Sequence, residues 1–209
     1  LKSPLAGIRA GAELLQEPLP LEDQQHFADN IVAQADKLHH LIERMLLLMR
    51  LEKSQTTTKQ ESIDMLTLLN SVISERLSMS LSKQVTITCS GELQPKLQGD
   101  LFWLQQAIGN VLDNALDFCE LGSTIKVWGE KVGNDWLLYI SNRGPHVDGF
   151  ALEKVFDRYF SLARSSGNRG SGIGLTLVQE VMQRHQGHAR LFNTKDGVCV
   201  SLRFHTTSP

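Results

Sequence analysis

The sequence predicts two parts of different fold class. The first is an all-α antiparallel helical hairpin, which would form a four-helix bundle as a dimer, and the second is an α+β sandwich domain. Apolar residues recur every three or four positions through residues 1–53, as on one face of a helix. A polar stretch without periodicity follows. Beyond it, helical patterns alternate with short stretches typical of strands.

Two amphipathic helices separated by prolines make up the predicted hairpin. Residues 17–21, Glu-Pro-Leu-Pro-Leu, end the first helix, because proline lacks the amide donor and clashes with the preceding turn. A second helix is predicted from about Glu22 to Lys53. Such a hairpin cannot cover its own apolar face, so either two hairpins pair into a four-helix bundle or the hairpin packs on the rest of the chain. The apolar stripes are Leu1, Leu5, Ile8, Ala12 and Leu15, then Ala28, Ile31, Ala35, Leu38, Ile42, Met45 and Met49.

The change of pattern sets the predicted domain boundaries. Residues 1–53 form the hairpin, the polar residues 54–61 form a linker, and residues 62–209 form the second domain. In that domain we predict helices from Asp64 to Lys83, from Asp100 as a cap to about Phe118, and from about Ile173 to a stop at Gly187. The predicted strands are residues 85–89, 124–130, 136–141, 191–193 and 198–204, with Gly133-Asn134 as a hairpin turn. They form one mostly antiparallel sheet with helices on one face.

Composition and charge exclude several classes of protein. With 41% hydrophobic residues, 21% charged residues and a formal net charge of −2, the chain lacks the basic excess of nucleic-acid binders, so we expect no nucleic-acid partner. Its three cysteines are far apart and form no metal-binding pattern, which is typical of a reducing compartment. The longest apolar run, residues 45–49, is far shorter than the roughly 20 residues that span a bilayer. Because the chain starts at Leu1 without a signal peptide, we expect it to be a fragment of a longer protein.

Asn110 and Asn114 form the first cluster of polar residues, within an otherwise apolar helix. They are four residues apart, so both amides project from one helical face. Amide oxygens are hard ligands that suit an Mg²⁺ ion shared with the phosphates of a nucleotide. Two ordinary surface or hydrogen-bonded buried asparagines fit the same spacing, so the pair by itself does not decide between these interpretations.

Two clusters that contain glycine follow. Residues 140–145, Ile-Ser-Asn-Arg-Gly-Pro, end a predicted strand, where glycine lets a flat ligand approach the backbone, although an ordinary turn has the same composition. Residues 170–175, Gly-Ser-Gly-Ile-Gly-Leu, run into a helix, whose N-terminal amides can bind a phosphate. A dinucleotide-binding motif would require a strand directly before these glycines, but the polar residues 161–169 precede them.

In this order and after this hairpin, the clusters resemble the motifs of two-component sensor histidine kinases. These kinases pair a dimerisation and phosphoacceptor hairpin (HisKA) with an ATP-binding domain of the type shared with Hsp90, gyrase and MutL (GHKL). The resemblance covers essentially the whole chain. It rests on residues 1–5 as the tail of the H-box, 110–115 as the N-box, 140–145 as the G1 box, 155–160 (Val-Phe-Asp-Arg-Tyr-Phe) as the F-box and 170–175 as the G2 box.

The resemblance implies roles for individual residues. Asn114 would ligate Mg²⁺, Asn110 would support it or contact phosphate, and Asn142 would face the amino group of adenine. Phe160 would stand near the nucleotide, at the start of a lid formed by residues 161–171. Arg164 and Arg169 of this lid would contact phosphate or lie in solvent. The other residues expected at the nucleotide are Gly144, Val147, Gly170, Gly172, Ile173, Gly174 and Leu175.

The implied activity is that of a protein-histidine kinase, which uses ATP and Mg²⁺ to phosphorylate a histidine and passes the phosphoryl group to an aspartate of a response regulator. The acceptor histidine and its adjacent glutamate would lie just before Leu1, since His26, His39 and His40 lack the H-box context. Ser3 falls where related kinases use a threonine or an asparagine to orient a hydrolytic water, so the resemblance leaves open a phosphatase role for this serine. The implied partners are a second copy in a homodimer and a response regulator. The full-length protein would be anchored in the bacterial inner membrane, with this part on the cytoplasmic side.

Three departures from the family pattern leave a second interpretation open. Asn142 stands where the family usually has aspartate, His146 replaces the second glycine of the G1 box, and Asp117 stands where many members carry a lysine that reaches phosphate. The alternative is a degenerate nucleotide-sensing or scaffolding module with weak or no kinase activity. A chaperone- or topoisomerase-type ATPase is disfavoured, because those enzymes do not open with this hairpin and H-box tail.

Overall fold

The computed structural model describes residues 2–53, 60–162 and 172–205. It divides the chain into two compact units, Leu1–Lys53 and Ser54–Pro209. Most of the predicted linker, residues 54–59, lies outside the described residues, and Glu61, which we assigned to the linker, is the first residue of a strand. Among the helices of the described residues, none is both long and apolar enough to span a membrane.

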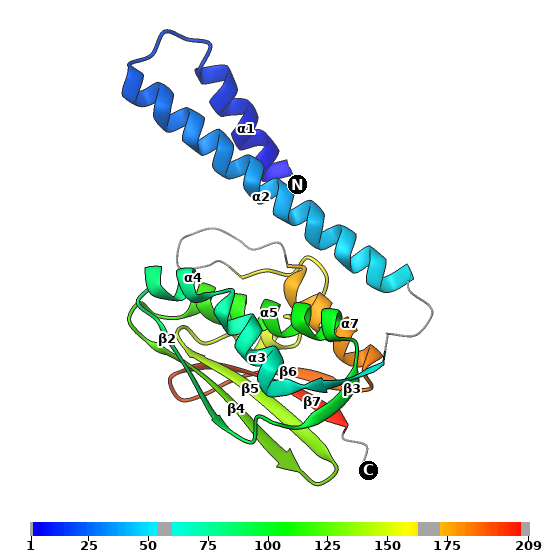
Figure 1. Cartoon of the computed structure of the whole chain (residues 1–209). Helices are drawn as coiled ribbons and strands as arrows, with labels where there is room; N and C mark the ends of the chain where they lie inside the picture. Colours follow the sequence, from blue (N-terminus) through cyan, green and yellow to red (C-terminus); the bar gives the residue numbers. More distant parts are fainter. Residues whose placement is uncertain (1, 54–59, 163–171, 206–209) are drawn as a thin grey trace. The chain divides into compact units, whose positions relative to one another are not determined.

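The first unit is a helical hairpin of α1 (Lys2–Leu14) and α2 (Leu21–Lys53) (Figure 1). α1 packs closely on α2 at Gly11, where an added Cβ would lie 2.9 Å from Cγ1 of Ile31. Apolar residues nonetheless stay exposed on both helices, and Leu5 and Val32 are each 59% exposed. The hairpin of one chain therefore leaves part of its apolar surface uncovered.

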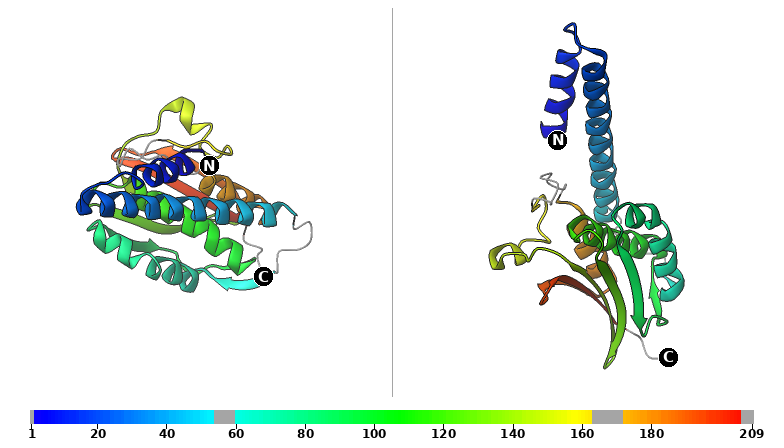
Figure 2. Two further views of the ribbon diagram at one scale, coloured as in Figure 1. Left: turned by 90° about the horizontal axis from the view of Figure 1, so that it is seen from above. Right: turned by 90° about the vertical axis from the view of Figure 1, so that its left-hand side faces the viewer.

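The second unit is an α+β sandwich whose main sheet has five strands in the order β2-β4-β5-β7-β6. β2 and β4 are parallel, and the other neighbouring pairs are antiparallel. The helices of this unit that pack on the sheet lie on one of its faces, and no described helix covers the other face (Figure 2). The strands are β2 (Thr86–Gly91), β4 (Thr124–Val132), β5 (Asp135–Arg143), β6 (His188–Asn193) and β7 (Gly197–His205), and the helices are α3 (Met65–Ser74), α5 (Leu101–Phe118) and α7 (Gly174–Arg184).

The prediction of a single helix from Asp64 to Lys83 is wrong, because the chain turns at Arg76 between α3 and α4 (Leu77–Ser82). The Arg76 guanidinium donates to both carboxylate oxygens of Asp113 on α5, at 2.8 and 3.3 Å. This ion pair joins residues 37 positions apart in the sequence, so helical periodicity does not reveal it. It holds the turn against α5.

Three short elements were not predicted: β1 (Glu61–Asp64), β3 (Lys96–Gly99) and α6 (Gly149–Leu152). β1 and β3 pair with each other in a separate antiparallel sheet. Four residues show too little of a repeat to be distinguished from a loop. The predicted cap and hairpin turn are confirmed, since Asp100 Oδ1 accepts from the Trp103 N–H at 3.2 Å and Gly133 turns the chain with a φ of +63°.

Alternate residues of β5 face the helices and form a buried row. Trp136, Leu138 and Ile140 are each at most 2% exposed, as is expected on the covered face of a sheet. Asn142 continues this row and is 8% exposed, paired in register with Val198 of β7. The alternation of the strand therefore carries one polar amide into a buried position at the strand's end.

His185 joins the C-terminal end of α7 to the N-terminal end of α5. Its Nδ1 lies 2.7 Å from the Val181 carbonyl oxygen, and its Nε2 accepts from the Asp100 N–H at 3.0 Å. Because Nε2 accepts a hydrogen bond, the ring is neutral, with its proton on Nδ1. Burial lowers the pKa of His185 from its ordinary value, although the Val181 hydrogen bond acts to raise it.

We expect acid to destabilise the second unit through His185. The unfolded chain, with an ordinary histidine pKa of about 6.5, binds the proton more tightly than the folded chain does. The contribution of His185 to the free energy of unfolding is therefore present above about pH 6.5 and is lost as the pH falls through the lowered folded pKa. His185→Gln keeps an oxygen acceptor for the Asp100 amide and removes the titrating ring. Thermal unfolding at a series of pH values should show a smaller acid-induced fall in Tm for this variant, and equal falls would contradict the assignment.

Candidate functional site

Asn110 lies where α5 meets the start of α7. It is 8% exposed, and its Nδ2 donates to the carbonyl oxygen of Gln106 at 2.8 Å. Its Oδ1 is turned toward α7, since a Cβ added to Gly174 would lie 2.9 Å from it. Asn114, one turn later on the same face of α5, is half-buried. The predicted asparagine pair thus lies beside the N-terminus of α7.

The N-terminus of α7 is suited to bind an anion. The helix begins at Gly174 behind Ile173, whose apolar side chain cannot accept hydrogen bonds from the first-turn amides as a serine or aspartate cap would. These amides and the helix dipole attract negatively charged oxygen atoms. Gly174 and Leu175 are half-buried, so the first turn is not fully enclosed.

Gly172 joins the residues before α7 to the end of the F-box segment. Its carbonyl oxygen accepts from the Tyr159 N–H at 3.0 Å and lies 3.3 Å from the Thr176 hydroxyl. The same hydroxyl lies 3.1 Å from the Phe156 carbonyl oxygen. Gly172 has a φ of +66°, and an added Cβ would lie 2.5 to 2.7 Å from backbone atoms of residues 159 and 160. The structure therefore requires glycine here and brings the half-buried Phe160 next to the G2 box.

Asn142 and Gly144 lie where β5 leaves the sheet, next to the C-terminal end of α5. The Nδ2 of Asn142 lies 3.4 Å from the Arg143 carbonyl oxygen, a long hydrogen bond at most. An added Cβ on Gly144 would collide with the carbonyl oxygen of Phe118. The Gly144 N–H donates to the Asp196 carbonyl oxygen at 3.2 Å. Asn142 is consequently a buried polar side chain at the end of β5.

The described residues bring the N-box, G1, F-box and G2 segments together around α5. Three of the predicted residues, Arg164, Arg169 and Gly170, lie outside the described residues, as does most of the predicted lid (residues 163–171). Ser3 is an exposed residue of α1 in the hairpin unit. Thr176 and Asn193 were missed by the sequence analysis, because each acts through hydrogen bonds to main-chain atoms that are distant in sequence.

Asp117, the acid that replaces the family's lysine, lies close to a cation. Lys83 Nζ is 3.9 Å from its Oδ1 and donates to the Leu116 carbonyl oxygen at 2.5 Å. Both side chains of this pair are partly exposed, so solvent screens the interaction. Asp117, which stands where many family members carry a lysine, therefore has a lysine from the end of α4 close to its carboxylate.

The side chains at the site determine which metal would fit. The described residues contain no group of three or more histidine, cysteine, aspartate or glutamate side chains that could hold a metal ion. A divalent ion beside Asn114 would depend on amide oxygens and on the phosphate oxygens of a ligand. Such a ligand set fits Mg²⁺, which binds through few protein ligands and keeps several waters, and not Zn²⁺.

Comparison with protein families matches both units. Residues 99–208 match the model of the histidine kinase-, DNA gyrase B- and HSP90-like ATPases, and residues 1–54 match that of the His Kinase A phospho-acceptor domain. The sensor protein CreC of Escherichia coli K12 is 34% identical over 206 residues, which are 98% of this chain and 43% of CreC. The sensor-like histidine kinase SenX3 of Mycolicibacterium smegmatis is 26% identical over 196 residues, which are 92% of this chain and 51% of SenX3. The chain thus spans about half the length of these relatives.

Solved structures share the same fold. Histidine kinase AdeS of Acinetobacter baumannii matches with a TM-score of 0.75 and 15% identity, over 99% of this chain and 97% of AdeS. Histidine kinase ThkA, solved in complex with the response regulator TrrA, matches with a TM-score of 0.81 and 16% identity, over 99% of this chain and 58% of that chain. At these identities, the similarity establishes the fold.

Two glycine substitutions should separate folding from ligand binding. Gly172→Ala should lower the free energy of unfolding by about 1–3 kcal/mol, because the backbone is left-handed and crowded by main-chain atoms. Gly174→Ala meets only the side-chain oxygen of Asn110 and lies in the first turn of a helix, so its stability should stay within about 1 kcal/mol of the wild type. It should instead weaken nucleotide binding, because Asn110 must rotate. Chemical denaturation and calorimetric ATP titration measure the two effects, and equal losses of stability would contradict this assignment.

Proposed function

Since the chain belongs to the sensor histidine kinases of two-component systems, we propose that it is the catalytic core of such an enzyme. It binds ATP, phosphorylates a histidine that precedes Leu1, and the phosphoryl group then passes to an aspartate of a response regulator. The observation that carries this proposal is the approach of Asn110 to the first turn of α7, with Asn142 buried at the end of the neighbouring strand. Family, fold and site therefore favour the same function.

The nucleotide binds with its adenine at Asn142 and its phosphates at α7. The Oδ1 of Asn142 accepts from the exocyclic amine of adenine. Gly144 and Val147 flank the ring, and Phe160 lies at the side of the G2 box. The amides from Gly172 to Leu175 donate to the phosphate oxygens, while the positive end of the α7 dipole stabilises their charge. Arg164 and Gly170 of the lid complete the phosphate contacts.

Asn114 ligates Mg²⁺ through its amide oxygen, and Asn110 supports the phosphates from the preceding turn. The ion neutralises charge on the phosphates during transfer. A neutral imidazole nitrogen of the acceptor attacks the γ-phosphorus, the bond to the β-phosphate oxygen breaks, and ADP leaves. Because imidazole is already nucleophilic, the residues of this chain contribute positioning and neutralisation of charge.

The hairpin forms the homodimer and the docking site of the regulator. The exposed Leu5 and Val32 indicate apolar surface that a second hairpin would cover in a four-helix bundle. The related fold of ThkA binds the response regulator TrrA, which supports a receiver domain as the partner of this chain. Ser3 orients a hydrolytic water in a phosphatase reaction. In the whole protein, this core lies on the cytoplasmic side of the bacterial inner membrane.

A degenerate module that binds nucleotide with little catalysis is the second candidate. It is favoured by the neutral Asn142 at the adenine position and by Asp117, which adds a negative charge beside the phosphate-binding face of α5. Lys83 offsets that charge in part. The two candidates differ in whether the histidine becomes phosphorylated.

Incubation of the full-length protein with radiolabelled ATP and Mg²⁺ tests the proposal. We expect a phosphorylated product that is stable in base and labile in acid. Asn114→Ala should abolish this label and the Mg²⁺-dependent binding of ATP, and should leave the dimer intact because the hairpin is a separate unit. Gln105→Ala, on the opposite side of α5 where its amide binds Glu75, is the control and should retain both activities. ATP binding without any label would favour the degenerate module.

Asn142→Asp should tighten ATP binding. Charged hydrogen bonds contribute roughly 1.5–3 kcal/mol and neutral ones nearer 1 kcal/mol, so the expected gain is roughly five- to tenfold in Kd. Selectivity for adenine over guanine should persist. Calorimetric titration of the protein with ATP and with GTP measures the affinity and the selectivity. Unchanged or weaker ATP binding in Asn142→Asp would show that residue 142 does not face adenine.

A further inference from the structure

Asn193, the last residue of β6, holds the main chain of Val147 at both of its polar groups. Its Oδ1 accepts from the Val147 N–H at 2.9 Å, and its Nδ2 donates to the Val147 carbonyl oxygen at 2.8 Å. The side-chain amide of Asn193 thus bonds both the N–H and the carbonyl oxygen of Val147, as the main chain of a neighbouring strand would. The two residues are 46 positions apart in the sequence, so this contact belongs to the tertiary structure.

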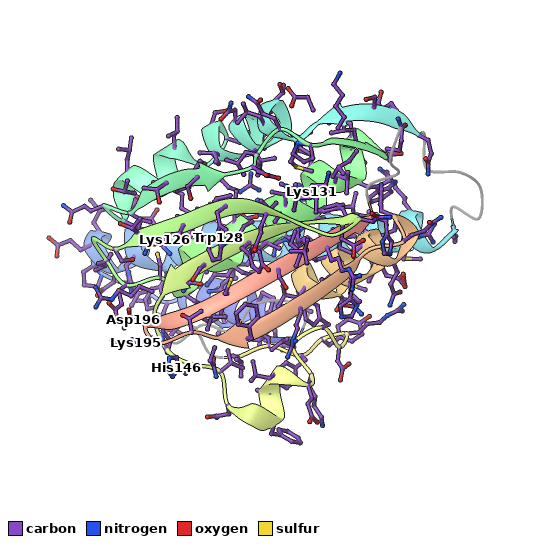
Figure 3. The ribbon with its side chains drawn as sticks, turned by 90° about the horizontal axis from the view of Figure 1, so that it is seen from below. Lys126, Trp128, Lys131, His146, Lys195 and Asp196 are labelled. Carbon is purple, nitrogen blue, oxygen red and sulfur yellow. The ribbon has the colours of Figure 1, made fainter. Side chains whose placement is uncertain are left out.

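The turn that follows Asn193 supports the same loop at a second point. The Asp196 carbonyl oxygen accepts a hydrogen bond from the Gly144 N–H at 3.2 Å. The turn itself is closed by a hydrogen bond from the Thr194 N–H to the Gly197 carbonyl oxygen at 2.8 Å. Figure 3 shows Lys195 and Asp196 at the same end of the sheet as His146. The β6–β7 turn therefore serves as a base for residues 144–147.

The loop from 144 to 147 has little other means of keeping its shape. Pro145 has no amide proton and cannot donate a hydrogen bond. His146 is exposed. Within the described part of the chain, hydrogen bonds hold this loop at Gly144 and Val147, and Asn193 makes two of these three bonds. The loop continues directly from Asn142, which is buried at the end of β5.

We propose that Asn193 is a positioning residue for the nucleotide site: by holding Val147, it keeps the loop beside Asn142 in the shape that receives adenine before the ligand arrives. This inference rests on the proposed function of the site. Without the hydrogen bonds to Asn193, the loop would have to become ordered when ATP binds. The free-energy cost of that ordering weakens the affinity for ATP and leaves the phosphate contacts unchanged. Loss of two partly exposed hydrogen bonds should weaken ATP binding about three- to tenfold.

The test compares Asn193→Ala and Asn193→Ser with the wild type, and with His188→Ala at the other end of β6 as a control. Alanine removes both bonds. Serine is shorter and has one polar atom in place of the two that asparagine uses, so it should restore the contact only in part. The Kd for ATP·Mg²⁺ should therefore rise in the order wild type, serine, alanine. In the full-length protein, Asn193→Ala should raise the KM for ATP by a similar factor with little change in kcat. Affinity for inorganic tripolyphosphate should stay unchanged, because the start of α7 is unaffected. His188→Ala should bind ATP as the wild type does.

Hydrogen exchange of the Val147 amide reports on the contact without any ligand. It should be faster in Asn193→Ala, while amides in the core strands exchange as in the wild type. Unchanged ATP affinity in Asn193→Ala, beside a wild type that binds ATP, would overturn this inference and leave the proposed function standing. Equal weakening of ATP and tripolyphosphate would also overturn it, since the effect would then not lie on the adenine side. A wild type that binds no ATP would overturn the proposed function and this inference with it.

Discussion

The contact of α5 with α7 over the sheet constrains the second unit, because the buried core and the polar site use the same helices. α5 places Leu104, Ile108 and Leu112 in the core, and all three are fully buried. Between those residues it carries Asn110, whose hydrogen bond to Gln106 directs the amide oxygen toward Gly174. A Cβ at position 174 would lie 2.9 Å from that oxygen, so even alanine there would turn the Asn110 amide. The packing that buries apolar surface therefore also sets the geometry at the start of α7.

Ion pairs around α5 compensate for acidic residues that the helix carries near the site. Asp113 is paired with Arg76 at the break between α3 and α4, and Asp117 lies near Lys83 at the end of α4. Both cations come from one short segment, residues 76–83, which includes α4. Asp135, at the other end of β5, is bound by Arg203 and His205 on β7, and these contacts lower its pKa against the effect of burial. These three sets of contacts thus join charges that come from different elements of the unit.

The opposite face of the sheet shows where the sequence pattern was informative and where it was not. Alternation along β4 and β5 predicted strands, and in the structure it places Trp128 on the face without helices (Figure 3). Its partner in register, Tyr139, stacks on it with ring centroids 4.8 Å apart. The pairing register of these two strands could not be predicted from the sequence, because alternation shows which residues share a face of a strand but not which residues of the neighbouring strand they pair with. Parallel pairing of β2 with β4 was likewise not predicted, because the connection between them contains β3 and a whole helix.

The sequence by itself indicated the hairpin and the longer helices and strands, because periodicity, proline, glycine and capping residues act over a few neighbouring positions. The N-box, G1 and G2 boxes were assigned by resemblance to the family. Only the tertiary structure decided the break at Arg76, the neutral state of His185, the approach of Gly174 to Asn110 and the hold of Asn193 on Val147. Each of these joins groups between 37 and 85 positions apart. A local pattern cannot encode such a contact, since hydrogen bonds and ion pairs of this kind exist only after the packed core has fixed where both partners lie.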